Sequence, residues 1–185
     1  MNDFQDVYRI QEDQDAPADV LRYYFISNGK TDIVKTIDYQ YVGHFNGIPL
    51  FNLAFGDYNP ETDLISDEEV SNNHDHYKVL HTVLNTIPLL FDTYGDVILM
   101  VQGSDSSSEF INKCRNDCKR RCAKGVCKKA HRRINIYTGF INKNFTQLNR
   151  SYRFYGGKWD GNQEFIEPYS IDSRYKTVLV VRKKS

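Results

Sequence analysis

Hydrophobic residues concentrate in three segments of the first third of the chain, and in the second segment they alternate with polar residues. Residues 21–26, 31–42 and 48–55 are rich in aromatic and branched aliphatic side chains. A period of two is typical of strands with one buried face. The pair Asn28-Gly29 separates the first two segments and favours a two-residue hairpin turn. The pattern therefore predicts an antiparallel sheet.

The second segment shows the alternation in detail. Ile37 and Tyr39 share one face of the predicted strand, whereas Thr36 and Asp38 face the other way. We therefore expect a half-buried strand with a polar outer face.

Two segments carry apolar residues at helical spacing. Residues 73–94 form the longer stripe, and residues 71–73 (Ser-Asn-Asn) are suitable caps at its start. Pro88 lies inside this segment and is expected to kink or split the helix, because proline has no N–H to donate to the Leu84 carbonyl. A second stripe runs from Ile134 to Leu148.

The remaining segments complete an α+β pattern. Residues 97–101 predict a central strand, because they are apolar on both faces. Residues 152–155 and 175–181 also predict strands, whereas residues 156–172 have the composition of a loop. We expect an α+β fold, with a mostly antiparallel sheet, two main helices and a short Cys-rich helical insert.

Charge divides the chain in two. The 185 residues have a net charge of zero and are 14% aromatic, which excludes disorder as the main state. Residues 1–100 hold 5 basic and 17 acidic residues, a net charge of −12, and residues 101–185 hold 19 and 7, a net charge of +12. The sequence begins without a secretory pattern, and its longest apolar run is residues 97–101. We therefore expect a cytoplasmic protein with no membrane partner.

The positive charge gathers between Lys113 and Arg133. Such a cluster attracts nucleic acid or another polyanion. Alternatively, the segment packs on the acidic half or is simply solvated. The predicted nucleic-acid-binding residues are Lys113, Arg115, Lys119, Arg120, Arg121, Lys124, Lys128, Lys129, Arg132 and Arg133.

All four cysteines lie in the same segment. They are Cys114, Cys118, Cys122 and Cys127, followed by His131 as an alternative ligand. Four thiols at this spacing can provide a tetrahedral zinc site, although the Cys-x2-Cys spacing common in structural zinc sites is absent. Two disulfides, or four thiols without a metal, are the alternatives.

A few polar residues are candidates for catalysis. Asp57 and Asp75 can form a carboxylate pair around a divalent ion. Ser104 follows the apolar strand, but no nucleophile elbow surrounds it. Arg133 lies where the second helix opens, which favours an anion there: a phosphate, a partner carboxylate or the acidic loop. The alternative for all four residues is turn and cap chemistry.

Several short motifs occur in a recognisable order. They are Asn52–Asp57 (NLAFGD), Asn73–Val83 (NHDHYKVLHTV), Gly103-Ser104 and Arg133–Tyr137 (RINIY). In this respect residues 40–185 resemble a family of uncharacterised bacterial proteins, a domain of unknown function whose second motif often has glycine at the His74 position. The resemblance implies a single domain (core residues 20–104 and 131–185) with an insert at residues 105–130. It also implies that Asp57, Asp75, Ser104 and Arg133 are possible neighbours, and it implies no reaction or cofactor.

These observations lead to three functional hypotheses. The first is an interaction module in which the basic insert binds nucleic acid or an acidic protein. The second is a metal-dependent phosphodiesterase or nuclease that uses Asp57 and Asp75. The third is a protein–protein interaction domain whose insert docks on a partner or, as a homo-oligomer, on a second copy.

Overall fold

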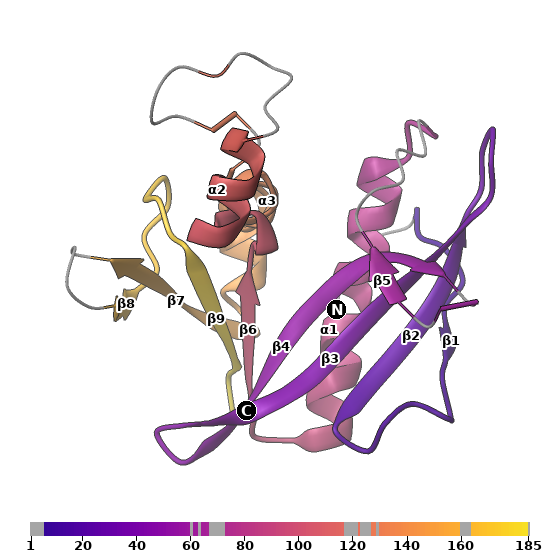
Figure 1. The fold of residues 1–185 in the computed structure, drawn as a ribbon. Coiled ribbons are helices and arrows are strands. Elements are labelled where there is room, and N and C mark those ends of the chain that lie inside the picture. Colours follow the sequence, from indigo (N-terminus) through magenta and orange to yellow (C-terminus); the bar gives the residue numbers. More distant parts are fainter. Residues whose placement is uncertain are drawn as a thin grey trace. The chain divides into compact units, whose positions relative to one another are not determined.

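The computed structural model describes most of the chain. The described residues are 6–59, 61–62, 64–66, 73–116, 122, 127–128, 130–159 and 164–184. Within them the fold is α+β, with mostly antiparallel strands, two long helices and a short one, which confirms the predicted class (Figure 1). The chain divides into two compact units, Met1–Val97 and Ile98–Ser185.

The first unit contains a meander of antiparallel strands. In order of pairing they are β1 (Gln11–Glu12), β2 (Val20–Ser27), β3 (Ile33–Phe45), β4 (Ile48–Asn59) and β5 (Leu64–Ser66). The register places Tyr23 opposite Ile37 and Ile37 opposite Phe55, so these apolar side chains share one face of the sheet. The three predicted strands are therefore confirmed.

Helix α1 (His76–Tyr94) packs on this apolar face. The Tyr39 hydroxyl contacts Thr86 Oγ1 at 2.7 Å, and the rings of Phe51 and Tyr94 lie 4.6 Å apart. Pro88 is buried inside the helix, which continues on both sides of it as one element, so the expected split is wrong. Burial of the apolar stripe stabilises the helix across the missing hydrogen bond.

The connection between β2 and β3 also differs from the prediction. Ser27 pairs with Ile33, so five residues lie between the strands rather than a two-residue turn. Asn73 holds this connection: its Oδ1 accepts from the Lys30 N–H at 3.1 Å, and its Nδ2 donates to the Thr31 carbonyl at 3.1 Å. Asn73 is therefore not a helix cap, and Asp75 precedes α1 without a side-chain cap bond.

The second unit has its own antiparallel strands. They are β6 (Ile98–Gln102), β7 (Tyr152–Trp159), β8 (Glu164–Pro168) and β9 (Thr177–Arg182), in the spatial order β6-β9-β7-β8. The 3-10 turn η1 (Ser104–Ser106), the short helix α2 (Ser108–Asn116) and the long helix α3 (Arg132–Leu148) lie between β6 and β7 in the chain. Figure 1 shows α2 and α3 in this unit.

Two strands occupy the region predicted as a loop. β7 extends to Trp159 and β8 follows it, although residues 156–172 have a loop-like composition. Gly156 contributes to the loop-like composition but lies in β7, where a Cβ would overlap the ring of Tyr175. This glycine therefore allows Tyr175 to pack closely on the strand and does not form a turn.

Hydrophobic side chains hold α3 in the second unit. Ile134, Phe140 and Ile141 are its buried residues. The ring of Phe145 packs against that of Phe154 of β7, tilted by 46° and with centroids 6.0 Å apart. Within the described residues, no helix combines the length and apolar character that crossing a membrane requires.

Candidate functional site

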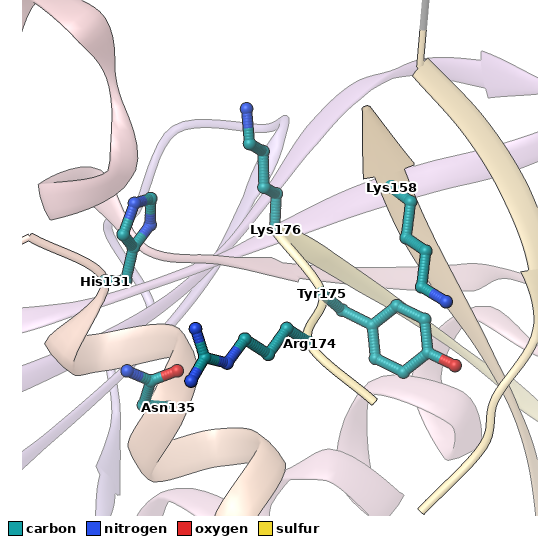
Figure 2. Close-up of a pocket in the computed structure, with 6 residues that line it drawn as sticks. All are labelled: His131, Asn135, Lys158, Arg174, Tyr175 and Lys176. Atoms are coloured by element: carbon teal, nitrogen blue, oxygen red, sulfur yellow. The ribbon is translucent and has the colours of Figure 1, made fainter. Parts of the chain in front are cut away.

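A basic cavity in the second unit is the strongest candidate site. Its volume is about 720 Å³, and Figure 2 shows six of the described side chains that line it. They are His131, Asn135, Lys158, Arg174, Tyr175 and Lys176. Helix α3 and the residue before it provide two of them, β7 provides one, and the segment before β9 provides three. None of these lining residues is acidic. We call this site the basic cavity.

Tyr175 anchors the segment that carries two of the cations. It is 5% exposed, its hydroxyl accepts from the Ser170 N–H at 2.8 Å, and the same hydroxyl lies 3.2 Å from Glu167 Oε1. Arg174 and Lys176, on either side of it, are exposed. Figure 2 shows the Arg174 side chain extending from this segment toward Asn135, and Lys176 on the other side of Tyr175 also lines the cavity. The buried Tyr175 thus anchors the segment that presents both cations to the cavity.

Lys158 has a carboxylate partner beside the cavity. Its Nζ lies 2.6 Å from Glu167 Oε1 and 5.1 Å from the centre of the Tyr175 ring. This hydrogen bond raises the pKa of Lys158, and it lowers the pKa of Glu167. Arg174 has no ion pair within the part of the chain that the structure describes. Its charge is therefore the most available to an incoming anion.

The start of α3 forms one wall of the basic cavity. His131 precedes the helix with φ of 61°, and its Nδ1 lies 3.0 Å from Ser106 Oγ. The backbone N–H of Arg133 donates to Asp105 Oδ2 at 3.1 Å. The buried Asp105 carboxylate thus provides the anion expected where this helix opens.

The Gly103-Ser104-Asp105 segment is built around this contact. A Cβ at Gly103 would lie 2.6 Å from Asp105 Oδ1, so the close packing needs glycine. Ser104 begins η1, and Asp105 reaches across to Arg133. The structure thus brings the segment that carries Ser104 to the helix start that carries Arg133.

The two predicted carboxylates of the first unit each have partners. Asp57 on β4 forms a buried ion pair with Lys35 on β3. Asp75 Oδ2 accepts from Ser27 Oγ at 2.6 Å and from the Tyr8 hydroxyl at 2.8 Å. Burial alone would raise the pKa of Asp75, but these two hydrogen bonds and the charge of Lys35 lower it below its ordinary value.

The loop before α1 has one residue in a left-handed conformation. His74 adopts a φ of 56°, a region that favours glycine. In the described residues no three His, Cys, Asp or Glu side chains converge in a way that could hold a metal ion.

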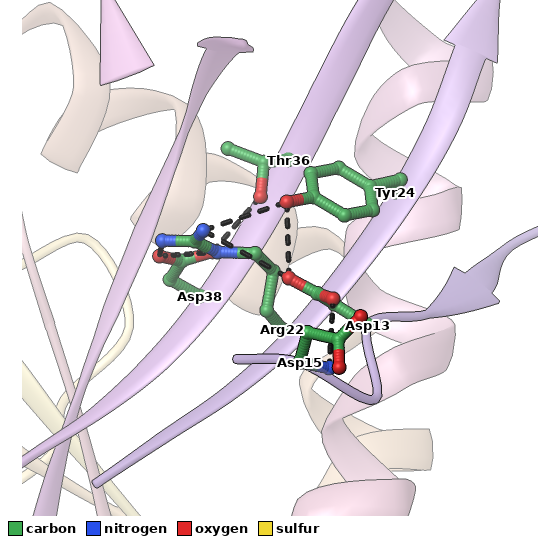
Figure 3. Close-up of polar contacts among 6 residues, drawn as sticks. All are labelled: Asp13, Asp15, Arg22, Tyr24, Thr36 and Asp38. Carbon is green, nitrogen blue, oxygen red and sulfur yellow. Dashed lines mark hydrogen bonds and ion pairs between the residues drawn. The ribbon is translucent and has the colours of Figure 1, made fainter. Parts of the chain in front are cut away.

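A second polar cluster of the first unit holds strands together (Figure 3). Arg22 donates to both oxygens of Asp38, at 2.9 Å to Oδ1 and 2.8 Å to Oδ2. Thr36 donates to the same carboxylate, and Tyr24 donates to Asp13. Thr36 and Asp38 are buried, so the expected polar outer face of β3 is wrong at these positions. The bidentate pair satisfies the buried carboxylate.

The predicted nucleic-acid-binding residues are only partly described. Lys113, Lys128 and Arg132 are exposed, Arg133 is half-buried, and Arg115 lies on α2. Lys119, Arg120, Arg121, Lys124 and Lys129 lie outside the described residues. Lys158, Arg174 and Lys176 were not predicted, because the fold brings them to His131 from other elements. The sequence signal that points to them is the Arg174-Tyr175-Lys176 pattern, in which a hydrophobic residue lies between two cations.

Two of the described cysteines lie close to each other, and the third contacts the backbone. The Sγ atoms of Cys114 and Cys127 are 3.3 Å apart, and Cys122 Sγ accepts from the Lys128 N–H at 3.4 Å. Cys118 lies outside the described residues. Zinc binding by the four cysteines, with His131 as an alternative ligand, stays a prediction.

Comparisons with known proteins identify one family. The model of a family of unknown function (DUF6934) matches residues 5–111, which is more than half of the chain. The match begins at residue 5, ahead of residue 40 where the resemblance in the motifs begins, and it ends before α3 and the basic cavity. No curated protein and no solved structure matches the chain.

Proposed function

Since this chain belongs to DUF6934, a family of unknown function, its role rests on its own residues, and we propose that it binds nucleic acid. The basic cavity and two exposed cations, Lys128 before α3 and Arg132 at its first position, form the binding surface. The basic insert, residues 105–130, is followed directly in the chain by His131, which lines the cavity, and by Arg132.

The arrangement of the cavity lining carries the proposal. Arg174, Lys176 and Lys158 come from two separate segments and line one cavity together with His131, and none of the described lining residues is acidic. Cations that cluster in this way concentrate anions locally. The volume of about 720 Å³ lies within the range of small-molecule sites, so the cavity has room for a phosphate and its sugar.

The same geometry favours contacts to the phosphate backbone. Tyr175 is the aromatic lining residue, but its ring is buried and its hydroxyl already has two partners. Stacking on bases requires an accessible aromatic face. We therefore expect binding that depends strongly on salt and weakly on base sequence.

Fluorescence anisotropy with single-stranded RNA, single-stranded DNA and duplex DNA tests this function. We expect the double variant Arg174→Glu/Lys176→Glu to bind at least about tenfold more weakly, with a salt slope lower by about 0.7–0.9 for each phosphate that is no longer neutralised. The double variant Lys143→Glu/Arg150→Glu is the matched control. It makes the same change in charge at two exposed residues of the same unit, one in α3 and one just after it.

Comparison of the two variants distinguishes binding at the basic cavity from a general attraction by the net positive charge of the unit. An equal loss in both variants would assign the effect to net charge, and an unchanged affinity of Arg174→Glu/Lys176→Glu would remove the basic cavity from the binding surface. Binding to polyglutamate but to no oligonucleotide would replace nucleic acid with an acidic protein partner. Binding that weakens in Arg120→Glu/Arg121→Glu would extend the surface into the insert.

A further inference from the structure

The geometry points to a redox site at Cys114 and Cys127: we propose that these two thiols form a reversible disulfide. Their Sγ atoms lie 3.3 Å apart, and both side chains are half-buried and so accessible to small reagents. Cys114 lies in α2, near its C-terminal end, and Cys127 precedes α3. This site is independent of the proposed nucleic-acid binding.

The distance between the sulfur atoms suits this reaction. A disulfide bond is about 2.05 Å long, so the two atoms must approach by a little more than about 1 Å. Small rotations of two side chains at the end of a short helix and in a connecting segment achieve such a movement. No rearrangement of α3 or of the sheet is required.

Cys114 and Cys127 are the pair that the described residues favour. Cys122 is the third described cysteine, and its sulfur accepts the Lys128 N–H. Oxidation therefore joins Cys114 to Cys127 and closes a loop across the basic insert.

The reaction is a thiol–disulfide exchange with a small-molecule disulfide, represented by oxidised glutathione. One protein thiolate attacks a glutathione sulfur, forms a mixed disulfide and releases one glutathione thiolate. The second protein thiolate then attacks the protein sulfur of the mixed disulfide and releases the second glutathione. Two electrons pass from the protein to glutathione, and the two thiol protons end on the two released glutathione molecules.

The disulfide would stiffen the approach to α3. The Ala130 N–H donates to the Cys127 carbonyl at 3.2 Å, and the His131 N–H donates to the Asp105 carbonyl at 3.3 Å. His131 is thus tied to the turn η1, and Cys127 and Ala130 are joined by a turn. Joining Cys127 to Cys114 would also tie this short segment to α2.

Thiol counting and peptide mapping on the full-length protein test the site. Reduced protein is equilibrated with mixtures of reduced and oxidised glutathione, its remaining thiols are titrated, and its disulfides are mapped by mass spectrometry without reduction. We expect the loss of two of the four thiols and a linked peptide joining Cys114 to Cys127. Cys114→Ser and Cys127→Ser should abolish this link, whereas the matched control Cys122→Ser should retain it.

Three results would overturn the proposal. One is a link from Cys114 or Cys127 to another cysteine in place of the expected pair. A second is the same two-thiol loss in Cys114→Ser. The third is a stoichiometric metal ion that protects all four thiols until a chelator is added, which would favour the zinc hypothesis. Because the mapping uses the wild-type chain, the test does not depend on the folding of a variant.

Discussion

The carboxylate of Asp105 accepts a hydrogen bond from the backbone N–H of Arg133, 28 residues further along the chain. A side chain distant in sequence thus satisfies one of the open N–H groups in the first turn of α3. Helix starts are usually capped by the residue that directly precedes them, but here that residue is His131, which has no side-chain cap bond. The contact holds the wall of the basic cavity in place.

Asp105→Ala should therefore destabilise the second unit. Loss of a cap costs about 0.5–2 kcal/mol, and the buried position of Asp105 places the effect toward the upper end. Urea unfolding followed by circular dichroism measures the change. Asp105→Asn is the control, because its amide oxygen can still accept the N–H of Arg133. An equal loss in both variants would show that the charge, rather than the hydrogen bond, matters.

Gly156→Ala should also destabilise the second unit, by about 1–3 kcal/mol, because the added methyl group would overlap the ring of Tyr175. Displacement of Tyr175 would move Arg174 and Lys176, so oligonucleotide affinity should fall as well. Thermal unfolding and anisotropy measure the two effects.

Gly139→Ala is the matched control for this prediction. A Cβ at Gly139 meets nothing within 4 Å, and the residue lies in α3. Alanine has the higher helix propensity, so this variant should be more stable by up to about 1 kcal/mol. Similar destabilisation by both substitutions would contradict the close packing of Gly156 against Tyr175.

The first unit should lose stability in acid through Asp75. Hydrogen bonds from Ser27 and Tyr8 hold the pKa of Asp75 below its unfolded value of 3.8. A depressed carboxylate pKa stabilises the folded state above the unfolded pKa, and this contribution is lost as the pH falls through the folded pKa.

Unfolding free energies of the wild type and of Asp75→Asn between about pH 7 and pH 2 measure this dependence. The stability difference should be largest near neutral pH and shrink below about pH 4. Asp19→Asn, which changes an exposed carboxylate of the same unit, should show no such trend. A difference that stays constant with pH would rule out the proposed role of Asp75.

Local patterns in the sequence determined the elements and the fold class. The pattern around Ile37 and Tyr39 predicts β3, and the helical stripe through Val83 predicts α1. Buried side chains recur every second residue in a strand with one buried face and about every 3.6 residues in a helix, so each element leaves its own spacing in the sequence. The same patterns gave wrong predictions at positions where the local structure depends on a side chain from a distant part of the chain. Tyr175 requires Gly156 within a strand, Asn73 holds the turn after β2, and Arg22 pairs with the buried Asp38.

The composition of the chain already shows that its second half is basic and that the cysteines and many cations share one segment. Which cations lie together depends on the folded arrangement. Lys158, Arg174 and His131 lie far apart in the chain, and they line one cavity because β7, the segment before β9 and the start of α3 come together. Such a site depends on contacts between distant segments, and composition and local periodicity do not predict which segments make contact.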